Sequence, residues 1–231
     1  KINRFTHIHQ SVDDLMKKAK MLRTISQKTG TCYQRCVGFD AMNATYTVTY
    51  ECDKALGTNY HERFKKFLIQ VQDNDWMVAG AMTDVKQVDP DMFVHVVEKR
   101  EDGIVIRGAK AHMTGMVNSD WMLIMPTMGM LENEAQYAVS CAIPVDAPGV
   151  THIFGRQTND DRKCEGTIDQ GNANYGIVGG ECLTVLDNVF VPWEYVFMCG
   201  EYQFSGLLVE RFACYPRQHY GACKGGVSDI V

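Results

Sequence analysis

The chain has 231 residues, of which 45% are hydrophobic and 22% charged, and its formal net charge is −5. This composition is typical of soluble globular proteins and provides enough apolar material for one large or two smaller domains. The acidic balance argues against a nucleic-acid partner, and the absence of an apolar run of about 18 residues argues against a membrane span. A start without an apolar leader, together with nine irregularly spaced cysteines, predicts a cytoplasmic, reducing compartment.

Residues 1–75 are predicted to be mostly helical. Ser11 is placed to cap a first helix, because Asp14 follows three residues later and apolar residues then occupy one helical face, namely Leu15, Ala19, Leu22 and Ile25. Gly30 is expected to end this helix, and a second helix is expected to begin near Cys36. The segment TYTVTY at residues 45–50 has strand propensity, which leaves that boundary open. A third amphipathic helix follows Asn59.

Residues 76–192 have a period of two and predict an antiparallel β domain. Residues 93–97 and 104–106 form a hairpin whose turn contains Asp102 and Gly103, and further strands are expected at residues 121–127, 136–145 and 182–192. From about Tyr195 the chain is predicted to be helical again. The fold class is therefore α+β, with expected domains at residues 1–75, 76–192 and 193–231. Both ends read as cut inside larger helical regions, so we expect a fragment.

Three cysteines in distant segments suggest a metal or iron–sulfur site. Cys32 and Cys36 are four residues apart and would face one side of a helix. The stretch YPRQHYGACKGG at residues 215–226 adds Cys223, with Tyr220 and Lys224 at helix-compatible spacing. Thiolates are the ligands that iron–sulfur clusters use, although a cysteine pair read alone is more often buried and structural. The other six cysteines are expected to be structural: Cys52, Cys141, Cys164, Cys182, Cys199 and Cys214.

Three motifs in order resemble the acyl-CoA dehydrogenase superfamily. They are AMTD at residues 81–84, GAKAHMTG at residues 108–115 followed by a strand, and LDNVFVP at residues 186–192. The resemblance implies an acyl-CoA dehydrogenase-like fold, with a helical N-terminal part, a central flavin domain and the start of a C-terminal helical bundle. It also implies FAD as a cofactor, contacted by residues that match the first two motifs, namely Met82, Thr83, Asp84, His112, Met113 and Thr114.

Longer stretches resemble a narrower group, the 4-hydroxybutyryl-CoA dehydratase/vinylacetyl-CoA Δ-isomerase family among the 4-hydroxyphenylacetate hydroxylases. They are CYQRCVGFD at residues 32–40, AHMTGMVNS at 111–119 and YGACKGG at 220–226. The resemblance implies a 4Fe-4S cluster held by Cys32, Cys36 and Cys223. It also implies active-site roles for five residues: Gln34, Thr114, Glu181, Tyr220 and Lys224.

The activity implied by this resemblance is the dehydration of 4-hydroxybutyryl-CoA to crotonyl-CoA by a flavin radical mechanism, with the cluster as Lewis acid and a homotetrameric assembly. Pro216 stands where the family has its histidine ligand, and His219 lies one helical turn nearer to Cys223. Two alternatives therefore stay open. One is a flavin-dependent aromatic hydroxylase of the same group, and the other is a chain that keeps the fold but is catalytically impaired.

Overall fold

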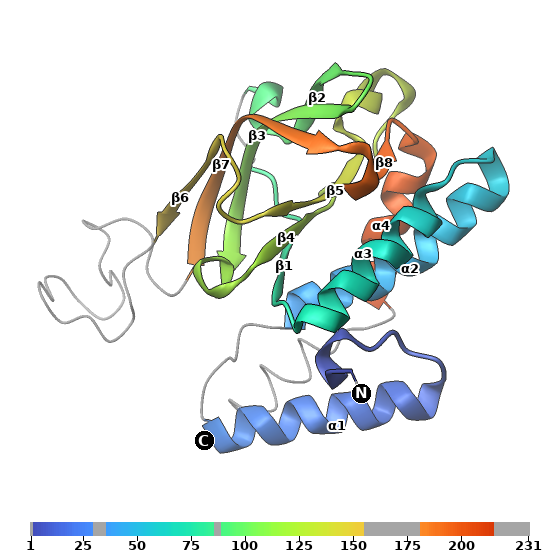
Figure 1. Cartoon of the computed structure of the whole chain (residues 1–231), viewed down its shortest axis with the longest axis vertical. Helices are drawn as coiled ribbons and strands as arrows, with labels where there is room; N and C mark the ends of the chain where they lie inside the picture. The colour runs from blue at the N-terminus through green and yellow to red at the C-terminus, as the bar shows by residue number, and fades with distance from the viewer. Residues whose placement is uncertain (1, 30–35, 86–88, 155–180, 215–231) are drawn as a thin grey trace, which may run out of the picture.

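The computed structural model describes residues 2–29, 36–85, 89–154 and 181–214, with only the backbone for Thr29, Cys36 and Cys214 (Figure 1). The α-helices are α1 (Val12–Thr29), α2 (Cys36–Leu56), α3 (Tyr60–Asn74) and α4 (Tyr202–Cys214). Short 3-10 helices lie at Arg4–Thr6, Pro90–Met92, Met116–Asn118, Glu132–Tyr137 and Trp193–Tyr195. In Figure 1 the helices gather on one side of the strands.

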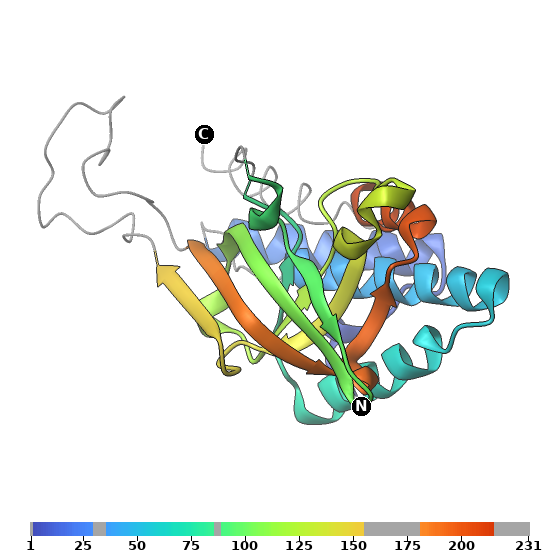
Figure 2. The same cartoon turned by 90° about the horizontal axis from the view of Figure 1, so that it is seen from above.

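The described strands form two four-stranded sheets. The first has the order β1-β4-β5-β8 and consists of β1 (Val78–Ala81), β4 (Trp121–Ile124), β5 (Val139–Pro144) and β8 (Val196–Cys199). The second has the order β2-β3-β7-β6 and consists of β2 (His95–Lys99), β3 (Gly103–Thr114), β7 (Glu181–Pro192) and β6 (Val150–Phe154). Figure 2 shows the long strands β3 and β7 side by side, as their antiparallel register requires.

The helices α1 and α3 begin where polar side chains bind their first amide groups. The hydroxyl of Ser11 accepts a hydrogen bond from the Asp14 amide at 3.1 Å, as the cap motif before α1 predicted. At the corner between α2 and α3, the carboxylate of Asp53 accepts hydrogen bonds from the amides of Tyr60 and His61, both at 2.9 Å. These bonds satisfy amide groups that have no partner inside a helix, and they fix the angle between α2 and α3.

The first sheet lies between the helices and the second sheet, so both of its faces are buried. Trp121 and Leu123 of β4 pack into the core formed with the helices, where Phe64 and Phe67 of α3 are fully buried. Met122 and Ile124, the alternate residues of the same strand, pack into a second core against β3 and β7. Successive side chains of a strand point to opposite faces, so this short strand joins the two cores.

The structure corrects two predictions and settles one boundary that the sequence left open. Residues 45–50, whose strand propensity had left that boundary open, lie inside α2. β1 and β4 are parallel, pairing Val78 with Trp121, so a purely antiparallel domain was wrong at this pair. The last helix begins at Tyr202 rather than near Tyr195, because Val196–Cys199 forms β8 and pairs with β5.

Candidate functional site

Three of the predicted site residues meet where β3 ends and β7 begins. Thr114 pairs with Glu181 in the strand register, and its hydroxyl donates a hydrogen bond to Glu181 Oε1 at 2.9 Å. His112 Nδ1 lies 3.3 Å from Glu181 Oε2. The His112 and Glu181 side chains are 72% and 36% exposed, so both are within reach of a bound molecule. This group supplies a hydroxyl, a carboxylate and an imidazole, which together can hold and transfer a proton.

A local distortion of β3 sets these orientations. The register with β7 shifts between Lys110 and Met113, and His112 has a φ of 56°. A side chain with a left-handed backbone costs on the order of 1–3 kcal/mol, and such strain is found most often at functional sites. The irregularity directs the His112 side chain outward, while Met113 is buried in the core beneath β3.

The second predicted flavin-facing segment, residues 82–84, lies directly beside this end of β3. The Ala111 amide donates a hydrogen bond to the Thr83 carbonyl at 2.8 Å, and Asp84 forms an isolated antiparallel bridge with Lys110. Thr83 is half-buried, and within the described part of the chain its hydroxyl takes part in no hydrogen bond. The two segments singled out by resemblance are therefore neighbours and present two threonine side chains.

The side chain of Asp84 is turned inward rather than toward this surface. Its Oδ1 accepts hydrogen bonds from Lys110 Nζ at 2.8 Å and from the Val94 amide at 3.0 Å. Burial lowers the pKa of Lys110, and the opposing charge of Asp84 acts in the other direction. Because Asp84 and Met113 both point into the interior, their contact with a molecule on this surface would come from the backbone. Lys110 was not selected as a site residue from the sequence. The only hint was its place in the largely apolar strand GIVIRGAKAHMT, where a lysine is unusual.

Met82, between β1 and Thr83, contributes to the site through its carbonyl. That carbonyl accepts hydrogen bonds from Lys110 Nζ at 2.8 Å and from the Thr127 hydroxyl at 2.6 Å. The Met82 side chain is partly buried and packs against the core beside the helices. As with Asp84, the structure ties this residue firmly to its surroundings.

The predicted iron ligands are outside the described residues, apart from the backbone of Cys36. So are Gln34, Tyr220 and Lys224, and the 4Fe-4S site stays a prediction. Within the described ranges, no three His, Cys, Asp or Glu side chains are grouped to hold a metal ion. Four cysteines have described side chains, and all four are buried and form no disulfide: Cys52, Cys141, Cys182 and Cys199. Burial raises the pKa of the Cys52 thiol to about 11 and also raises that of Cys141, as befits structural residues.

The first turn of α2 nevertheless lies against β1. A Cβ atom added to Gly38 would stand 1.7 Å from the Val78 carbonyl oxygen, and one added to Gly80 would stand 2.9 Å from the Val37 carbonyl oxygen. Only glycine allows so close an approach of two backbones. The helix that starts at the predicted ligand Cys36 is therefore in contact with the strand that leads into residues 82–84.

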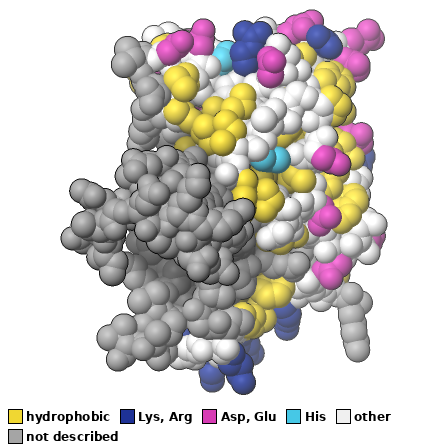
Figure 3. Space-filling model, turned by 90° about the vertical axis from the view of Figure 1, so that its left-hand side faces the viewer, with side chains coloured by type: hydrophobic (Ala, Val, Ile, Leu, Met, Phe, Trp, Pro, Cys, Tyr) yellow, Lys and Arg dark blue, Asp and Glu magenta, His cyan; other side chains and the backbone are white. Residues whose placement is uncertain are grey.

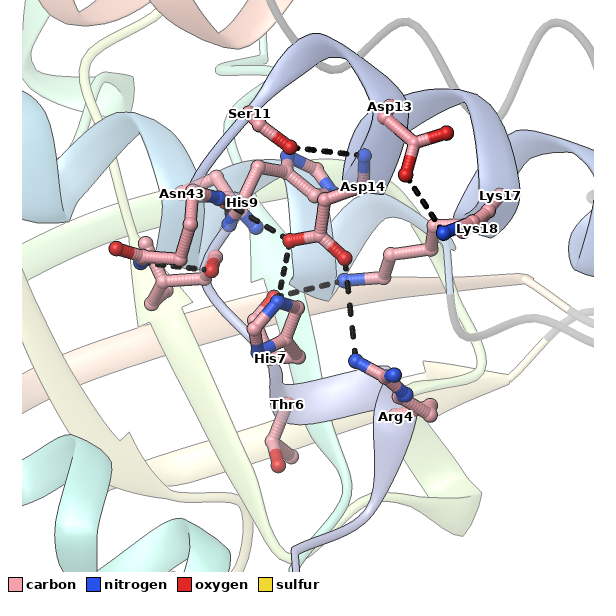
Figure 4. Close-up of polar contacts among 12 residues, drawn as sticks. Arg4, Thr6, His7, His9, Ser11, Asp13, Asp14, Lys17, Lys18 and Asn43 are labelled. Carbon is pink, nitrogen blue, oxygen red and sulfur yellow. Dashed lines mark hydrogen bonds and ion pairs between the residues drawn. The ribbon is translucent and has the colours of Figure 1, made fainter.

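A separate polar cluster fastens the N-terminal arm, residues 2–11, to α1 (Figure 4). The Asp14 carboxylate contacts His7 and accepts a hydrogen bond from the Gln10 amide at 3.1 Å. Lys18 Nζ donates a hydrogen bond to the His7 carbonyl at 3.0 Å. Burial lowers the pKa of Lys18 to about 8 and that of His9 to about 4. These contacts explain how the arm is held, and none of the predicted site residues takes part.

A pocket of about 590 Å³ lies between this arm and α2. Its described lining includes Asn43, Tyr46, Tyr50 and His61, and none of its lining residues is a carboxylate, lysine or arginine. The rings of Tyr46 and Tyr50 each make a T-shaped contact with His61, with ring centroids at 4.7 and 5.5 Å. The described lining thus has no carboxylate and includes none of the predicted site residues, so we place the candidate site at the β3–β7 end instead.

The surface charges and the helix lengths describe the outside of the molecule. On the face shown in Figure 3, lysine and arginine side chains are separated by acidic and hydrophobic ones rather than gathered in one patch. Among the described helices, none is both long and apolar enough to cross a membrane.

The architecture is a mixed helix-and-sheet fold, with a polar site at a strand end beside a tightly held loop. The family model described as 4-hydroxyphenylacetate 3-hydroxylase N terminal matches residues 1–198, and the chain belongs to this family. Within it, the chain is 55% identical over 241 aligned positions to the 4-hydroxybutyryl-CoA dehydratase/vinylacetyl-CoA-Delta-isomerase of Clostridium aminobutyricum. That alignment covers 100% of this chain and 49% of the relative, so the chain spans about half of its length.

Solved structures of related proteins have a similar fold. An oxygen-tolerant archaeal 4-hydroxybutyryl-CoA dehydratase from N. maritimus is 48% identical, with a TM-score of 0.88 over 99% of this chain and 47% of that one. The oxygenase component of 4-hydroxyphenylacetate 3-monooxygenase, solved with FAD, has a TM-score of 0.70 over 99% of this chain and 49% of that one. Its identity is 20%, so this likeness shows the fold alone.

Proposed function

We propose that this chain belongs to an enzyme that dehydrates 4-hydroxybutyryl-CoA to crotonyl-CoA and isomerises vinylacetyl-CoA, a lyase with isomerase activity. The observation that carries the proposal is the 55% identity, over the whole chain, with the Clostridium aminobutyricum dehydratase/isomerase. We also propose that the fold is acyl-CoA dehydrogenase-like and that the enzyme acts as a homo-oligomer on an acyl-CoA substrate.

The residues of the β3–β7 end fit a flavin. Thr83, His112 and Thr114 offer hydroxyl and imidazole groups on one surface, and a flavin ring needs such hydrogen-bonding groups along its nitrogen and carbonyl edge. The donor set of Cys32, Cys36 and Cys223 fits a 4Fe-4S cluster, because thiolates are its usual ligands. When bound, FAD would supply an electron acceptor and the cluster a Lewis acid.

The chain's own residues would handle the protons. Dehydration removes a hydrogen from C3 and hydroxide from C4, and isomerisation moves a proton from C2 to C4. The Glu181 carboxylate accepts the Thr114 hydroxyl on Oε1, which leaves Oε2 beside His112 and open to a substrate. Glu181 is therefore our candidate for proton transfer at C2. Tyr220 and Lys224 have the spacing to donate protons to the departing oxygen, and Gln34 lies between two of the proposed ligands.

The test is anaerobic purification followed by an assay with 4-hydroxybutyryl-CoA. The proposal expects bound FAD, about four irons and four sulfides per chain, and formation of crotonyl-CoA. Glu181→Gln should lower turnover by about 100-fold or more, as expected for loss of a general base. Glu98→Gln is the matched control, because Glu98 is an exposed hairpin carboxylate paired with Arg100, and its turnover should stay unchanged. Flavin without iron, or equal turnover of Glu181→Gln and wild type, would overturn the proposal.

An aromatic hydroxylase is the second candidate. It is favoured by the 32% identity over 205 residues, 78% of this chain, with the FADH(2)-dependent monooxygenase TftD of Burkholderia cepacia. That reading expects bound flavin without iron and oxygen-dependent hydroxylation of a phenol when reduced flavin is supplied. Supplying both substrate types to one preparation separates the two candidates.

A further inference from the structure

Lys110 is a buried ammonium group that joins the two sheets. Its side chain is 1% exposed, and Nζ lies 2.8 Å from each of three acceptors: Asp84 Oδ1, the Met82 carbonyl and the Met125 carbonyl. An ammonium group has three protons, so this set satisfies all of them. Lys110 is on β3 of the second sheet, whereas Met82 and Met125 directly follow β1 and β4 of the first.

A second set of hydrogen bonds, from Thr127 and Ala111, holds the same short segment, residues 82–84. The Thr127 hydroxyl donates a hydrogen bond to the Met82 carbonyl at 2.6 Å and accepts one from the Asp84 amide at 2.7 Å. The Thr83 carbonyl is bound by the Ala111 amide of β3. Met82, Thr83 and Asp84 are thus each held by at least one hydrogen bond. Met82 and Asp84 are each bound by both Lys110 and Thr127.

Stability alone does not account for a buried ion pair at this position. Removing a lysine and an aspartate from water costs several kcal/mol for each ion, and well-packed apolar residues at such positions often stabilise a protein as well or better. An unpaired buried charge is much less favourable than a paired one, so the pair strongly disfavours any other path for residues 82–84. The consequence is a fixed local conformation, in which Thr83 and Thr114 keep their relative positions.

We propose that Lys110 is a positioning residue for the flavin. It holds residues 82–84 against the end of β3, so that the Thr83 side chain and the Thr114–Glu181–His112 group form one fixed surface for the isoalloxazine edge. This inference rests on the proposed function, since it needs a flavin on that surface. Lys110 itself is buried beneath the surface and acts through residues 82–84.

The test compares FAD binding in two variants, one that lacks only the Lys110 charge and one that lacks both charges of the pair. Lys110→Met keeps an unbranched side chain, one atom shorter, but leaves Asp84 unpaired, so the double variant Lys110→Met/Asp84→Asn is made alongside it. In the double variant no charge of the pair remains, and the side-chain amide oxygen introduced at position 84 still offers an acceptor to the Val94 amide. We expect both variants to bind FAD about tenfold more weakly or worse, as is typical when a supporting contact is lost. We also expect a shift in the reduction potential of the bound flavin.

Lys18→Met is the matched control. Lys18 is also a buried lysine whose ammonium group donates to main-chain carbonyls, but it lies on α1 within the cluster of Figure 4. Its replacement should leave FAD affinity and flavin potential unchanged, even where the melting temperature changes. Amide hydrogen exchange in the flavin-free protein gives an independent measure, because the Asp84 and Ala111 amides should exchange faster in the Lys110 variants and not in Lys18→Met.

The outcomes separate the inference from the function beneath it. A folded double variant that binds FAD as tightly as wild type, with the same potential, overturns the positioning role while the dehydratase proposal stands. A loss of FAD affinity in Lys18→Met equal to that in the Lys110 variants also overturns it, because the effect would then be one of general stability. A wild-type protein that takes up no FAD overturns the proposed function and the role of Lys110 together.

Discussion

Replacing Gly38 with alanine should destabilise the protein strongly, because two backbones meet at this position. The added Cβ would stand 1.7 Å from the Val78 carbonyl oxygen and 2.8 Å from its carbon. Even close carbon–oxygen contacts in proteins are about 3.3 Å or longer, so α2 and β1 would have to separate by roughly 1.6 Å. Neither partner is a flexible side chain that could rotate away.

The size of the effect follows from two opposing terms. Overpacking a core costs about 1–3 kcal/mol when side chains can adjust, and a clash between backbones is expected to reach or exceed the upper end. Replacing a helical glycine with alanine returns about 1 kcal/mol. The net loss in the free energy of unfolding should therefore be about 2 kcal/mol or more, measured by urea denaturation at constant m-value.

Gly206→Ala is the matched control, because Gly206 also lies inside a helix. Its added Cβ would meet the Gly129 Cα at 3.4 Å, an ordinary contact, so this variant should be neutral or slightly more stable than wild type. If Gly38→Ala is as stable as wild type, or no less stable than Gly206→Ala, the close approach of α2 to β1 is wrong. Because Cys36 begins the same helix, Gly38→Ala should also lower iron and flavin content if the proposed function holds.

Three further predictions concern the core, acid stability and the thiols. Phe67→Ala removes a ring that packs on Phe64, Trp121 and Phe197 and should cost about 3–5 kcal/mol, whereas Ile69→Ala on the exposed side of α3 should cost less than about 1 kcal/mol in the same urea titration. Burial lowers the pKa of His9 to about 4 from its usual 6.5, so its contribution is complete above pH 6.5 and is lost as the pH falls toward 4, because the unfolded chain takes up the proton first. After a discount because the ring is only partly buried, this amounts to about 1–2 kcal/mol, and His9→Gln should flatten the pH dependence of unfolding accordingly; an unchanged slope would contradict the assignment. Iodoacetamide labelling of the native protein, mapped by mass spectrometry, should spare the buried thiols Cys52, Cys141, Cys182 and Cys199 and modify Cys32, Cys36 and Cys223 only when iron has been removed; rapid labelling of the first group would contradict their burial.

The predictions that the structure confirms depend on local signals. Ser11 and Asp14 define the start of α1 because the cap bond is made within four residues. The Asp102–Gly103 motif marks the hairpin between β2 and β3 correctly, and Gly103 is the first residue of β3. The meeting of Thr114 with Glu181 is of another kind, since it depends on the register of distant strands. The family resemblance, rather than any periodicity, had singled out both residues.

Burial explains both the predictions that failed and the helix–strand boundary at residues 45–50 that the sequence left open. β1 (VAGA) and β8 (VFMC) are buried on both faces and therefore show no alternation of polar and apolar residues. Residues 45–50 are rich in β-branched side chains yet helical, because Val48 and Thr49 are buried by tertiary packing. The Thr49 hydroxyl donates to the Thr45 carbonyl one turn earlier, so the helix also satisfies its polar group.

Lys110 shows why a site built on buried charge escapes sequence reasoning and yet is informative once seen. A lysine in a strand is expected to face solvent, and its partner Asp84 lies in another segment, so neither residue indicates the pair by itself. The pair becomes intelligible only when three segments come together: β3 supplies the donor, residues 82–84 after β1 supply two acceptors, and Met125 after β4 supplies the third. Such a group cannot reposition without leaving a charge unpaired in the interior. Residues 82–84 are therefore held in one conformation, and under the proposed function they are the residues that a flavin on the β3–β7 end would touch.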